Sequence, residues 1–188
     1  MTALLLIDIQ NDYFPNGKFP LPEMVEVGLR CQNILNAARK NDLSVVHIQH
    51  IFPKGMGKFL CAGTQGALIH ECVKPLSHET IITKEFPNSF HKTSLNKHLL
   101  KLGCKHVILI GAMTQMCIDA TARAALDLGY QVTICDDAIA AQRVNQQGIS
   151  LDTTQVNAAF LSALSMAQAR VLPSTQLLHK ESLSNAPS

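Results

Sequence analysis

Apolar and polar residues follow two periods along this chain, one typical of strands and one typical of helices. Short apolar runs predict six strands, at residues 3–8, 44–50, 79–84, 107–110, 131–135 and 170–172. Apolar residues at helical spacing predict four helices, at residues 24–40, 94–102, 115–128 and 153–167. Asp152 or Thr153 is expected to open the last helix, because both residue types favour the position before a first helical turn.

The alternation of strands with helices is typical of parallel strands joined by crossover helices. Continuously apolar strands fit a sheet that is covered on both faces, and right-handed crossovers complete such a fold. We therefore predict an α/β, three-layer α/β/α sandwich around a six-stranded, mainly parallel sheet. One domain is expected over residues 1–180, followed by a flexible tail at residues 181–188. The aperiodic segment 51–78 is long enough to be a lid or an oligomer contact.

Composition excludes several functional classes for this chain. It has 188 residues, 47% of them hydrophobic, and a formal net charge of +2. Without a Lys/Arg cluster interleaved with aromatic residues, we expect no nucleic-acid partner. The apolar runs are too short to span a bilayer, and the N-terminus lacks the basic region of a signal peptide. We therefore expect a cytoplasmic protein with reduced cysteines, and the absence of CxxC spacing speaks against a zinc knuckle.

Three chemically reactive side chains fall at the ends of predicted strands. Asp8 ends the first strand, Lys84 ends the third, and Cys117 follows the fourth. Functional groups of open α/β sheets gather at the carboxyl ends of the strands, so we expect these three in one crevice. A carboxylate can take a thiol proton and later return it, while a nearby ammonium stabilises both anions.

Cys117 has an additional electrostatic reason to be reactive. Its position predicts the first turn of a helix, where unpaired N–H groups and the positive end of the helix dipole favour a thiolate. By position alone, however, a cysteine at a strand–helix junction is more often a small buried hydrophobe. The case for catalysis depends on Asp8 and Lys84 lying beside it.

Three segments around these residues carry recognisable motifs. They are residues 6–14 (LIDIQNDYF), residues 83–90 (TKEFPNSF) and residues 111–117 (GAMTQMC). In content and order they resemble the motifs of the isochorismatase-like cysteine hydrolases, and the resemblance extends over roughly residues 3–175.

This resemblance implies a Rossmann-like sheet with strand order 3-2-1-4-5-6 and a catalytic triad of Asp8, Lys84 and Cys117. It also implies a cis peptide bond between Ala112 and Met113, with the amides of Met113 and Cys117 facing an oxyanion. Family members with an intact triad mostly hydrolyse carbon–nitrogen amide bonds of small molecules through a cysteine thioester. The resemblance further implies a homo-oligomer, a dimer or tetramer, and no cofactor.

Substrate contacts are expected from polar and aromatic side chains near the three motifs. The candidates are Gln10, Tyr13, Phe14, Phe86, Phe90 and Gln115. The phenylalanines could equally be ordinary core residues, and Gln10 could cap a turn. Asp136 and Asp137 follow the fifth predicted strand, where one of them is expected to cap the next turn.

Nicotinamidases of this family carry an Asp-x-His metal motif after the second strand. This chain has His47 and His50 there but no aspartate at the matching spacing. Residues three apart in a strand point to opposite faces, so these histidines make a poor metal pair. His70 lies in the 51–78 segment, and nothing in its spacing demands a ligand role. We therefore predict no required metal and disfavour nicotinamidase activity.

Two alternatives remain open at this point. Isochorismatases proper hydrolyse a vinyl ether, a reaction that the family can perform with the carboxylate and without the cysteine. A noncatalytic thiol-based sensor or binding domain would also use a low-pKa cysteine. That second alternative leaves Asp8 and Lys84 without roles and lacks a resolving cysteine nearby in sequence.

Overall fold

The computed structural model describes residues 1–53 and 55–178, so the tail expected at residues 181–188 lies outside the described residues. Its centre is a six-stranded sheet of order β3-β2-β1-β4-β5-β8, in which every pair of neighbours is parallel. The strands are β1 (Thr2–Ile7), β2 (Ser44–His50), β3 (Thr80–Lys84), β4 (His106–Ala112), β5 (Gln131–Ala140) and β8 (Arg170–Leu172). Counted within this sheet, the order is the predicted 3-2-1-4-5-6, which confirms the fold.

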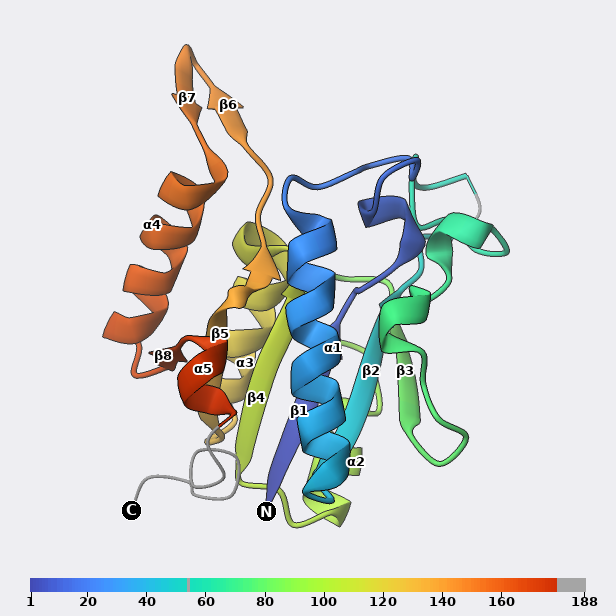
Figure 1. Ribbon diagram of the computed structural model, residues 1–188, viewed down its shortest axis with the longest axis vertical. Coiled ribbons are helices and arrows are strands. Elements are labelled where there is room, and N and C mark those ends of the chain that lie inside the picture. Colours follow the sequence, from blue (N-terminus) through green and yellow to red (C-terminus); the bar gives the residue numbers. More distant parts are fainter. Residues whose placement is uncertain (54, 179–188) are drawn as a thin grey trace.

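Helices cover both faces of this sheet and form the outer layers of the sandwich (Figure 1). The helices are α1 (Met24–Lys40), α2 (Leu95–Lys101), α3 (Asp119–Asp127), α4 (Thr153–Met166) and α5 (Ser174–Leu177). Helices α1 and α5 lie on one face, and α2 and α3 lie on the other, where α4 packs against α3. Asp152, one of the two residues expected to open this helix, caps α4 through a capping box with Gln155.

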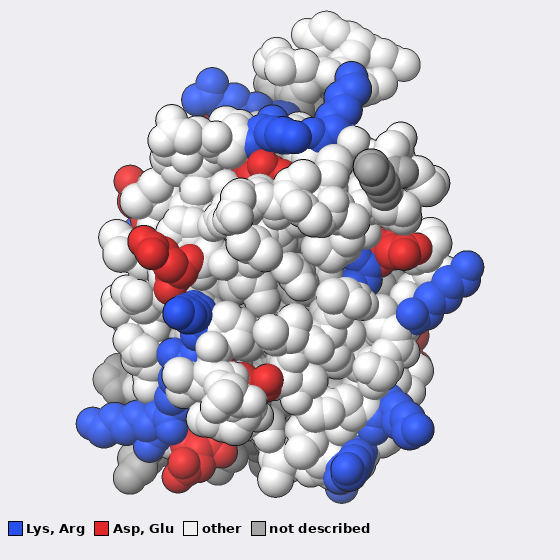
Figure 2. All heavy atoms as spheres, turned by 90° about the vertical axis from the view of Figure 1, so that its right-hand side faces the viewer, with Lys and Arg blue, Asp and Glu red and all other residues white. Residues whose placement is uncertain are grey.

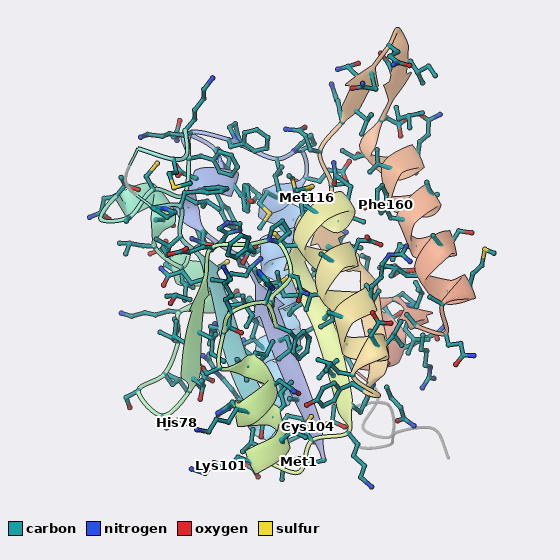
Figure 3. All side chains as sticks on the ribbon, turned by 180° about the vertical axis from the view of Figure 1, so that it is seen from behind. Met1, His78, Lys101, Cys104, Met116 and Phe160 are labelled. Atoms are coloured by element: carbon teal, nitrogen blue, oxygen red, sulfur yellow. The ribbon has the colours of Figure 1, made fainter. Side chains whose placement is uncertain are left out.

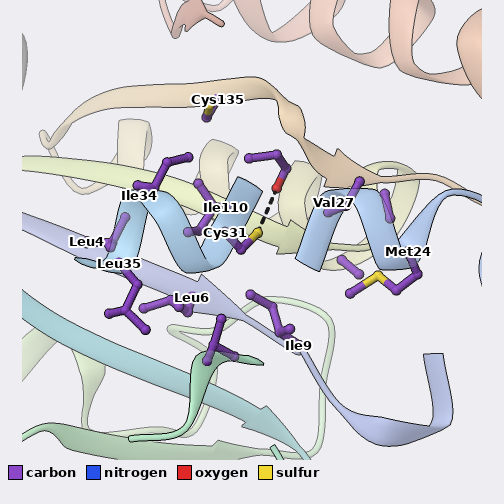
Figure 4. Packing of buried hydrophobic residues seen from close by; sticks show 14 of the residues in the cluster. Leu4, Leu6, Ile9, Met24, Val27, Cys31, Ile34, Leu35, Ile110 and Cys135 are labelled. Carbon is purple, nitrogen blue, oxygen red and sulfur yellow. Dashed lines mark hydrogen bonds between the residues drawn. The ribbon is translucent and has the colours of Figure 1, made fainter. Parts of the chain in front are cut away.

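Strand β1 divides the hydrophobic core into two clusters, because successive side chains of a strand point to opposite faces. Leu4 and Leu6 pack with Ile34 and Leu35 of α1 (Figure 4). Leu5 and Ile7 pack on the other face, in the cluster that α2, α3 and α4 complete. These four side chains of β1 are at most 1% exposed, so the sheet is covered on both sides at its centre.

The structure departs from the predicted elements in three places. Strand β5 continues to Ala140 instead of ending at Cys135, with an irregular register between β4 and β5. An antiparallel hairpin of β6 (Val144–Gln146) and β7 (Ile149–Leu151) follows it and projects from the body of the protein (Figure 1). Its strands are only three residues long and mostly exposed, too short for a pattern that predicts a strand.

The third departure concerns the predicted helix at residues 115–128. The chain first forms a π-helical turn, η4 (Thr114–Ile118), and only then the α-helix α3. π-Helical turns are rare in proteins, and those that occur are often found at functional sites. The first part of the predicted helix is therefore a wider turn, and Cys117 lies in it.

The 51–78 segment is anchored over the carboxyl ends of β1 and β2. It contains two short 3₁₀ turns, η2 (Gln65–Ala67) and η3 (Glu71–Val73). The chain after β1, which includes the 3₁₀ turn η1 (Asn11–Tyr13), holds it through backbone hydrogen bonds from Asn11 to Leu68 and from His70 to Ile9. Buried Asp12 adds a hydrogen bond from the Leu60 N–H. These hydrogen bonds hold the segment over the carboxyl ends of β1 and β2.

The surface carries no concentrated charge on the side that Figure 2 shows. Blue and red side chains are interspersed there and separated by wide uncharged areas. Among the described helices, none combines the length and apolar composition needed to cross a bilayer.

Gly111 permits the close approach of β4 to β1. Its φ of +120° is strained for any residue with a side chain, and a Cβ there would collide with the backbone carbonyl of Ile7. Ile7 and Gly111 are partners in the register of the two strands. The glycine thus sets how closely the chain after β1 approaches the chain after β4.

We predict that Gly111→Ala lowers the free energy of unfolding by about 3 kcal/mol or more, because a strained φ is combined with a backbone collision. Urea unfolding followed by circular dichroism measures this change. Gly129 is the matched control: its φ is +83°, but a Cβ added there would have no neighbouring atom within 4 Å. Gly129→Ala should cost only about 1 kcal/mol. Equal losses in the two variants would contradict the packing argument.

Candidate active site

The carboxyl ends of β1, β2 and β3 bring Asp8, His50 and Lys84 together. In the sheet register Ile7 pairs with Ile48, and His50 pairs with Lys84. Asp8 follows directly after β1 with a φ of +53°, and its N–H donates to the Ile48 carbonyl. Asp8 and Lys84 therefore lie together at the carboxyl ends of the strands, as predicted from their positions.

Asp8 and Lys84 form a buried ion pair. Lys84 Nζ lies 2.9 Å from Asp8 Oδ2 and donates a hydrogen bond of 2.9 Å to the Pro87 carbonyl. Burial by itself would raise the pKa of Asp8, but the Lys84 ammonium and His50 outweigh it, and the pKa lies below its ordinary value. Burial likewise opposes the charge on Lys84, but Asp8 and Cys117 raise its pKa above the ordinary value. Both groups are therefore charged near neutral pH.

Cys117 reaches this pair from the η4 turn after β4. Thr114, in the same turn, donates from its hydroxyl to the Ala140 carbonyl and so fastens the turn to β5. Figure 3 shows neighbouring Met116 at the end of the sheet opposite Met1 and Cys104. The Cys117 side chain is buried, with 4% of its surface exposed.

The charge state of Cys117 differs from the sequence-based expectation. Burial raises the pKa of its thiol, the Asp8 carboxylate raises it further, and Lys84 opposes both only in part. The expectation that a helix N-terminus would favour the thiolate is therefore wrong for this resting state. Desolvation and a neighbouring carboxylate outweigh a helix end that lies beyond a π-helical turn. The thiol is protonated at rest and needs a base.

His50 lies inside the site, which the sequence-based reasoning missed. Its Nδ1 is 3.7 Å from Asp8 Oδ2 and 3.8 Å from the Cys117 sulfur. The signal that would have found it is the one used for Asp8 and Lys84: His50 is the last residue of a parallel strand. His47, three residues earlier, points elsewhere and pairs with Glu79 at 3.0 Å.

The two glutamines predicted to bind substrate are both paired with backbone. Gln10 donates to the carbonyls of His50 (2.9 Å) and Ala67 (2.7 Å) and accepts from the His50 N–H (2.8 Å). Gln115 donates to the Gln142 carbonyl and accepts from the Gln142 N–H. Each amide keeps some hydrogen-bonding capacity beyond these bonds. In this state both glutamines hold chain segments in place.

The four predicted aromatic contacts fall in different environments. Tyr13 lies near the site: burial, Asp8 and Cys117 all raise the pKa of its phenol. Phe14 packs its ring against His70, with centroids 3.5 Å apart. Phe90 stacks on Tyr130 and packs against the core. Phe86 is 38% exposed and lines a cavity of about 360 Å³ together with Lys84.

The peptide bond between Ala112 and Met113 is cis, at the position that the family resemblance implies. Met113 is the residue before η4, and its carbonyl accepts from the N–H groups of Met116 and Ile118. The use of the Met113 and Cys117 amides as oxyanion donors stays a prediction.

One group of side chains could in principle hold a metal ion. Ligand atoms of Asp8, His50 and Cys117 all lie within 4.8 Å of one another. The Lys84 ammonium, 2.9 Å from Asp8, competes for the same carboxylate oxygen. His70 is engaged elsewhere, since it accepts from the Cys72 N–H. That no metal is required stays a prediction, and a cation would have to displace Lys84 from Asp8.

The chain is similar to known proteins over most of its length. The family model of the isochorismatase domain matches residues 2–168 of the chain. The isochorismatase family protein YddQ of Bacillus subtilis is 41% identical over 170 residues, which cover 90% of this chain and 94% of YddQ.

Two further matches are a solved structure and a named enzyme. A crystal structure from Oleispira antarctica, described as an isochorismatase hydrolase, has a TM-score of 0.90 and 41% identity, covering 94% of this chain and 95% of that one. Nicotinamidase 3 of Arabidopsis thaliana is 29% identical, over 74% of this chain and 73% of its own length.

The buried ion pair leads to a prediction about stability. Lys84→Met should lower the free energy of unfolding at pH 7 by about 3–5 kcal/mol, because it leaves the Asp8 carboxylate buried without its partner. The double variant Asp8→Leu/Lys84→Met should recover most of this loss, since it removes both charges. Urea unfolding measures the free energy of unfolding of the wild type, the single variant and the double variant. Lys97 is exposed, so Lys97→Met is the control for loss of a lysine.

The same pair predicts the sign of a pH effect. The pKa of Asp8 is lowered from 3.8, so the stabilisation is complete above pH 3.8 and is lost as the pH falls below that value. The wild type should therefore lose more stability between pH 5 and pH 3 than the double variant does. A double variant with the same acid sensitivity as the wild type would contradict this assignment.

Proposed function

The chain belongs to the isochorismatase family, and from this premise we propose that it is a cysteine hydrolase that cleaves the carbon–nitrogen bond of a small amide. The observation that carries the proposal is the burial of a thiol beside a carboxylate–ammonium pair, in Cys117, Asp8 and Lys84. A relative named as a nicotinamidase supports amide chemistry.

In the proposed first half-reaction, the Cys117 thiol loses its proton towards Asp8 as the sulfur attacks the amide carbonyl carbon. A carbon–sulfur bond forms, and the negative charge on oxygen faces the amides of Met113 and Cys117. The carbon–nitrogen bond then breaks, and the leaving nitrogen takes up the proton. Ammonia or an amine departs, and Cys117 carries a thioester.

Water completes the proposed cycle. Asp8 accepts a proton from a water molecule as the oxygen of that water attacks the thioester carbonyl. The carboxylic acid product leaves when the carbon–sulfur bond breaks. The proton returns to the sulfur, which restores the thiol. Lys84 keeps Asp8 ionised between turnovers, so that the base is present at neutral pH. Exclusion of bulk water by the buried site strengthens these interactions.

The setting of this reaction is also part of the proposal. We place the enzyme in the cytoplasm, acting on a small molecule as a dimer or tetramer and without a cofactor. The mixed charge on the face in Figure 2 fits a partner that is neither nucleic acid nor a membrane.

The proposal predicts that Cys117→Ala lowers amide hydrolysis by about 10³-fold or more, because the nucleophile is lost. The measurement is ammonia release from a panel of small primary amides, followed by kinetics on the amide that the wild type cleaves best. Asp8→Asn should fall by a similar factor. Cys61→Ala, a part-exposed thiol outside the site, is the control and should retain wild-type rates.

Full activity in Cys117→Ala would disprove the thioester route. Pyruvate release from isochorismate that survives Cys117→Ala would instead identify vinyl-ether hydrolysis as the reaction. A wild type that is inactive on both classes, with intact folding, would favour the noncatalytic alternative.

A further inference from the structure

The chain between β3 and α2 is tied both to the ion pair and to the helix after the nucleophile turn. Near its start, the Pro87 carbonyl accepts a hydrogen bond of 2.9 Å from Lys84 Nζ. Two residues further on, Ser89 meets Thr121, which lies in α3 four residues after Cys117. This segment therefore connects the ammonium of the ion pair with the helix that follows the nucleophile turn.

Ser89 is held on three sides. Its N–H donates to Thr121 Oγ1 at 3.1 Å, and the two hydroxyl oxygens lie 2.8 Å apart. The Ser89 carbonyl accepts from the Thr93 hydroxyl at 2.6 Å. Ser89 and Thr121 are both fully buried. An apolar pair could fill the same space, whereas a buried polar pair with satisfied hydrogen bonds also makes the local chain rigid and specifies its course.

The hydrogen-bonding capacity of Thr121 leads on to Pro87. A hydroxyl has one donor and can accept two hydrogen bonds. One arrangement uses all of this capacity: Ser89 donates to Thr121 from both its N–H and its O–H, and Thr121 donates to the Pro87 carbonyl at 3.5 Å. The last distance is long for a hydrogen bond, so the tie through Ser89 is the stronger restraint on Pro87.

The Lys84 ammonium has three N–H groups, and the site offers each of them an acceptor. The Asp8 carboxylate and the Pro87 carbonyl both lie 2.9 Å from Nζ, and interaction with the Cys117 sulfur also raises the pKa of Lys84. Because the three N–H groups diverge at fixed angles, the place of one acceptor decides how well the other two are met. The Pro87 carbonyl takes no part in the proposed chemistry, so its contribution is to direct the ammonium.

We propose that the Ser89–Thr121 pair positions the Lys84 ammonium. By fixing the Pro87 carbonyl, the pair directs the ammonium onto the carboxylate of the ion pair and towards the nucleophile. This inference rests on the proposed function, in which that carboxylate is the base and Cys117 is the nucleophile. Ser89 and Thr121 are positioning residues, because they act only through Pro87 and Lys84.

Nuclear magnetic resonance of the Lys84 ammonium tests this role without a substrate. In ¹⁵N-labelled protein, a buried and hydrogen-bonded ammonium exchanges its protons slowly enough to give a cross-peak, and Lys84→Met identifies the peak of Lys84. Thr121→Val keeps the shape of the side chain without the hydroxyl. It should speed proton exchange of Lys84 at pH 7 by about tenfold or more, or abolish the peak. Thr121→Ser keeps the hydroxyl and should restore slow exchange.

Thr133→Val is the matched control, because Thr133 is a buried threonine whose hydroxyl bonds to His106 instead, at 2.8 Å. It loses a hydroxyl of the same kind but should leave the Lys84 peak unchanged. The thermal midpoint of each variant is recorded to verify folding. Ser89→Ala keeps the N–H bond to Thr121 and should change the peak less, in the same direction. It takes the place of Thr121→Val if that variant does not fold.

Kinetics distinguish positioning of Lys84 from a loss of substrate binding. On the amide that the wild type cleaves best, Thr121→Val should lower kcat by about tenfold or more and leave KM within about threefold. A displaced ammonium compensates Asp8 less, so the pKa of Asp8 rises and the acid limb of the kcat/KM profile moves to higher pH. Thr121→Ser should restore both kcat and the pH profile.

The proposal is overturned by an unchanged Lys84 peak or an unchanged kcat in folded Thr121→Val, and by an equal change in Thr133→Val. It is also overturned if the wild type gives no Lys84 peak, because the ammonium is then not held. The ammonia-release assay addresses the proposed function separately. A Lys84 peak that Thr121→Val changes, in a protein that cleaves no amide, would support the positioning role and refute the amidase.

Discussion

The ion pair between Asp8 and Lys84 is the interaction on which the site depends. It joins the ends of β1 and β3, which are not neighbours, across the end of β2. The pair can form only if the register of three strands is right, with Ile7 opposite Ile48 and His50 opposite Lys84. A buried carboxylate without a partner is costly, so the pair couples the chemistry of the site to the fold.

The same pair, together with burial, influences the protonation of Cys117, the proposed nucleophile. Because Asp8 is already compensated by Lys84, a thiolate at Cys117 would add an uncompensated negative charge to a buried site, and the pKa of the thiol is raised. The resting site therefore holds a thiol, a carboxylate and an ammonium. Such a site becomes nucleophilic only as the proton leaves, which ties activation of the sulfur to the attack itself. His50 lies beside both groups, with its Nδ1 3.7 Å from the Asp8 carboxylate and 3.8 Å from the Cys117 sulfur.

Two buried or half-buried glutamines show how side chains replace missing strand partners around the site. Gln10 pairs with the backbone of His50, and Gln115 pairs with the backbone of Gln142. Each amide supplies one donor and one acceptor at a spacing that matches a peptide group. In sequence both look like polar residues available for a ligand. Their use as backbone clamps depends on which chain segment comes to lie opposite them.

The sequence by itself determined the architecture and the grouping of Asp8, Lys84 and Cys117. Alternating apolar periods identified the six sheet strands, and parallel strands place their carboxyl ends at one edge, so Asp8, Lys84 and Cys117 could be grouped without coordinates. Tertiary structure decided the rest. Burial and neighbouring charge, which a linear pattern does not contain, reversed the expected shift in the pKa of Cys117. The packing of β2 against its neighbours turned His50 towards the sulfur and His47 towards Glu79, because facing directions become contacts only once the opposing elements are in place.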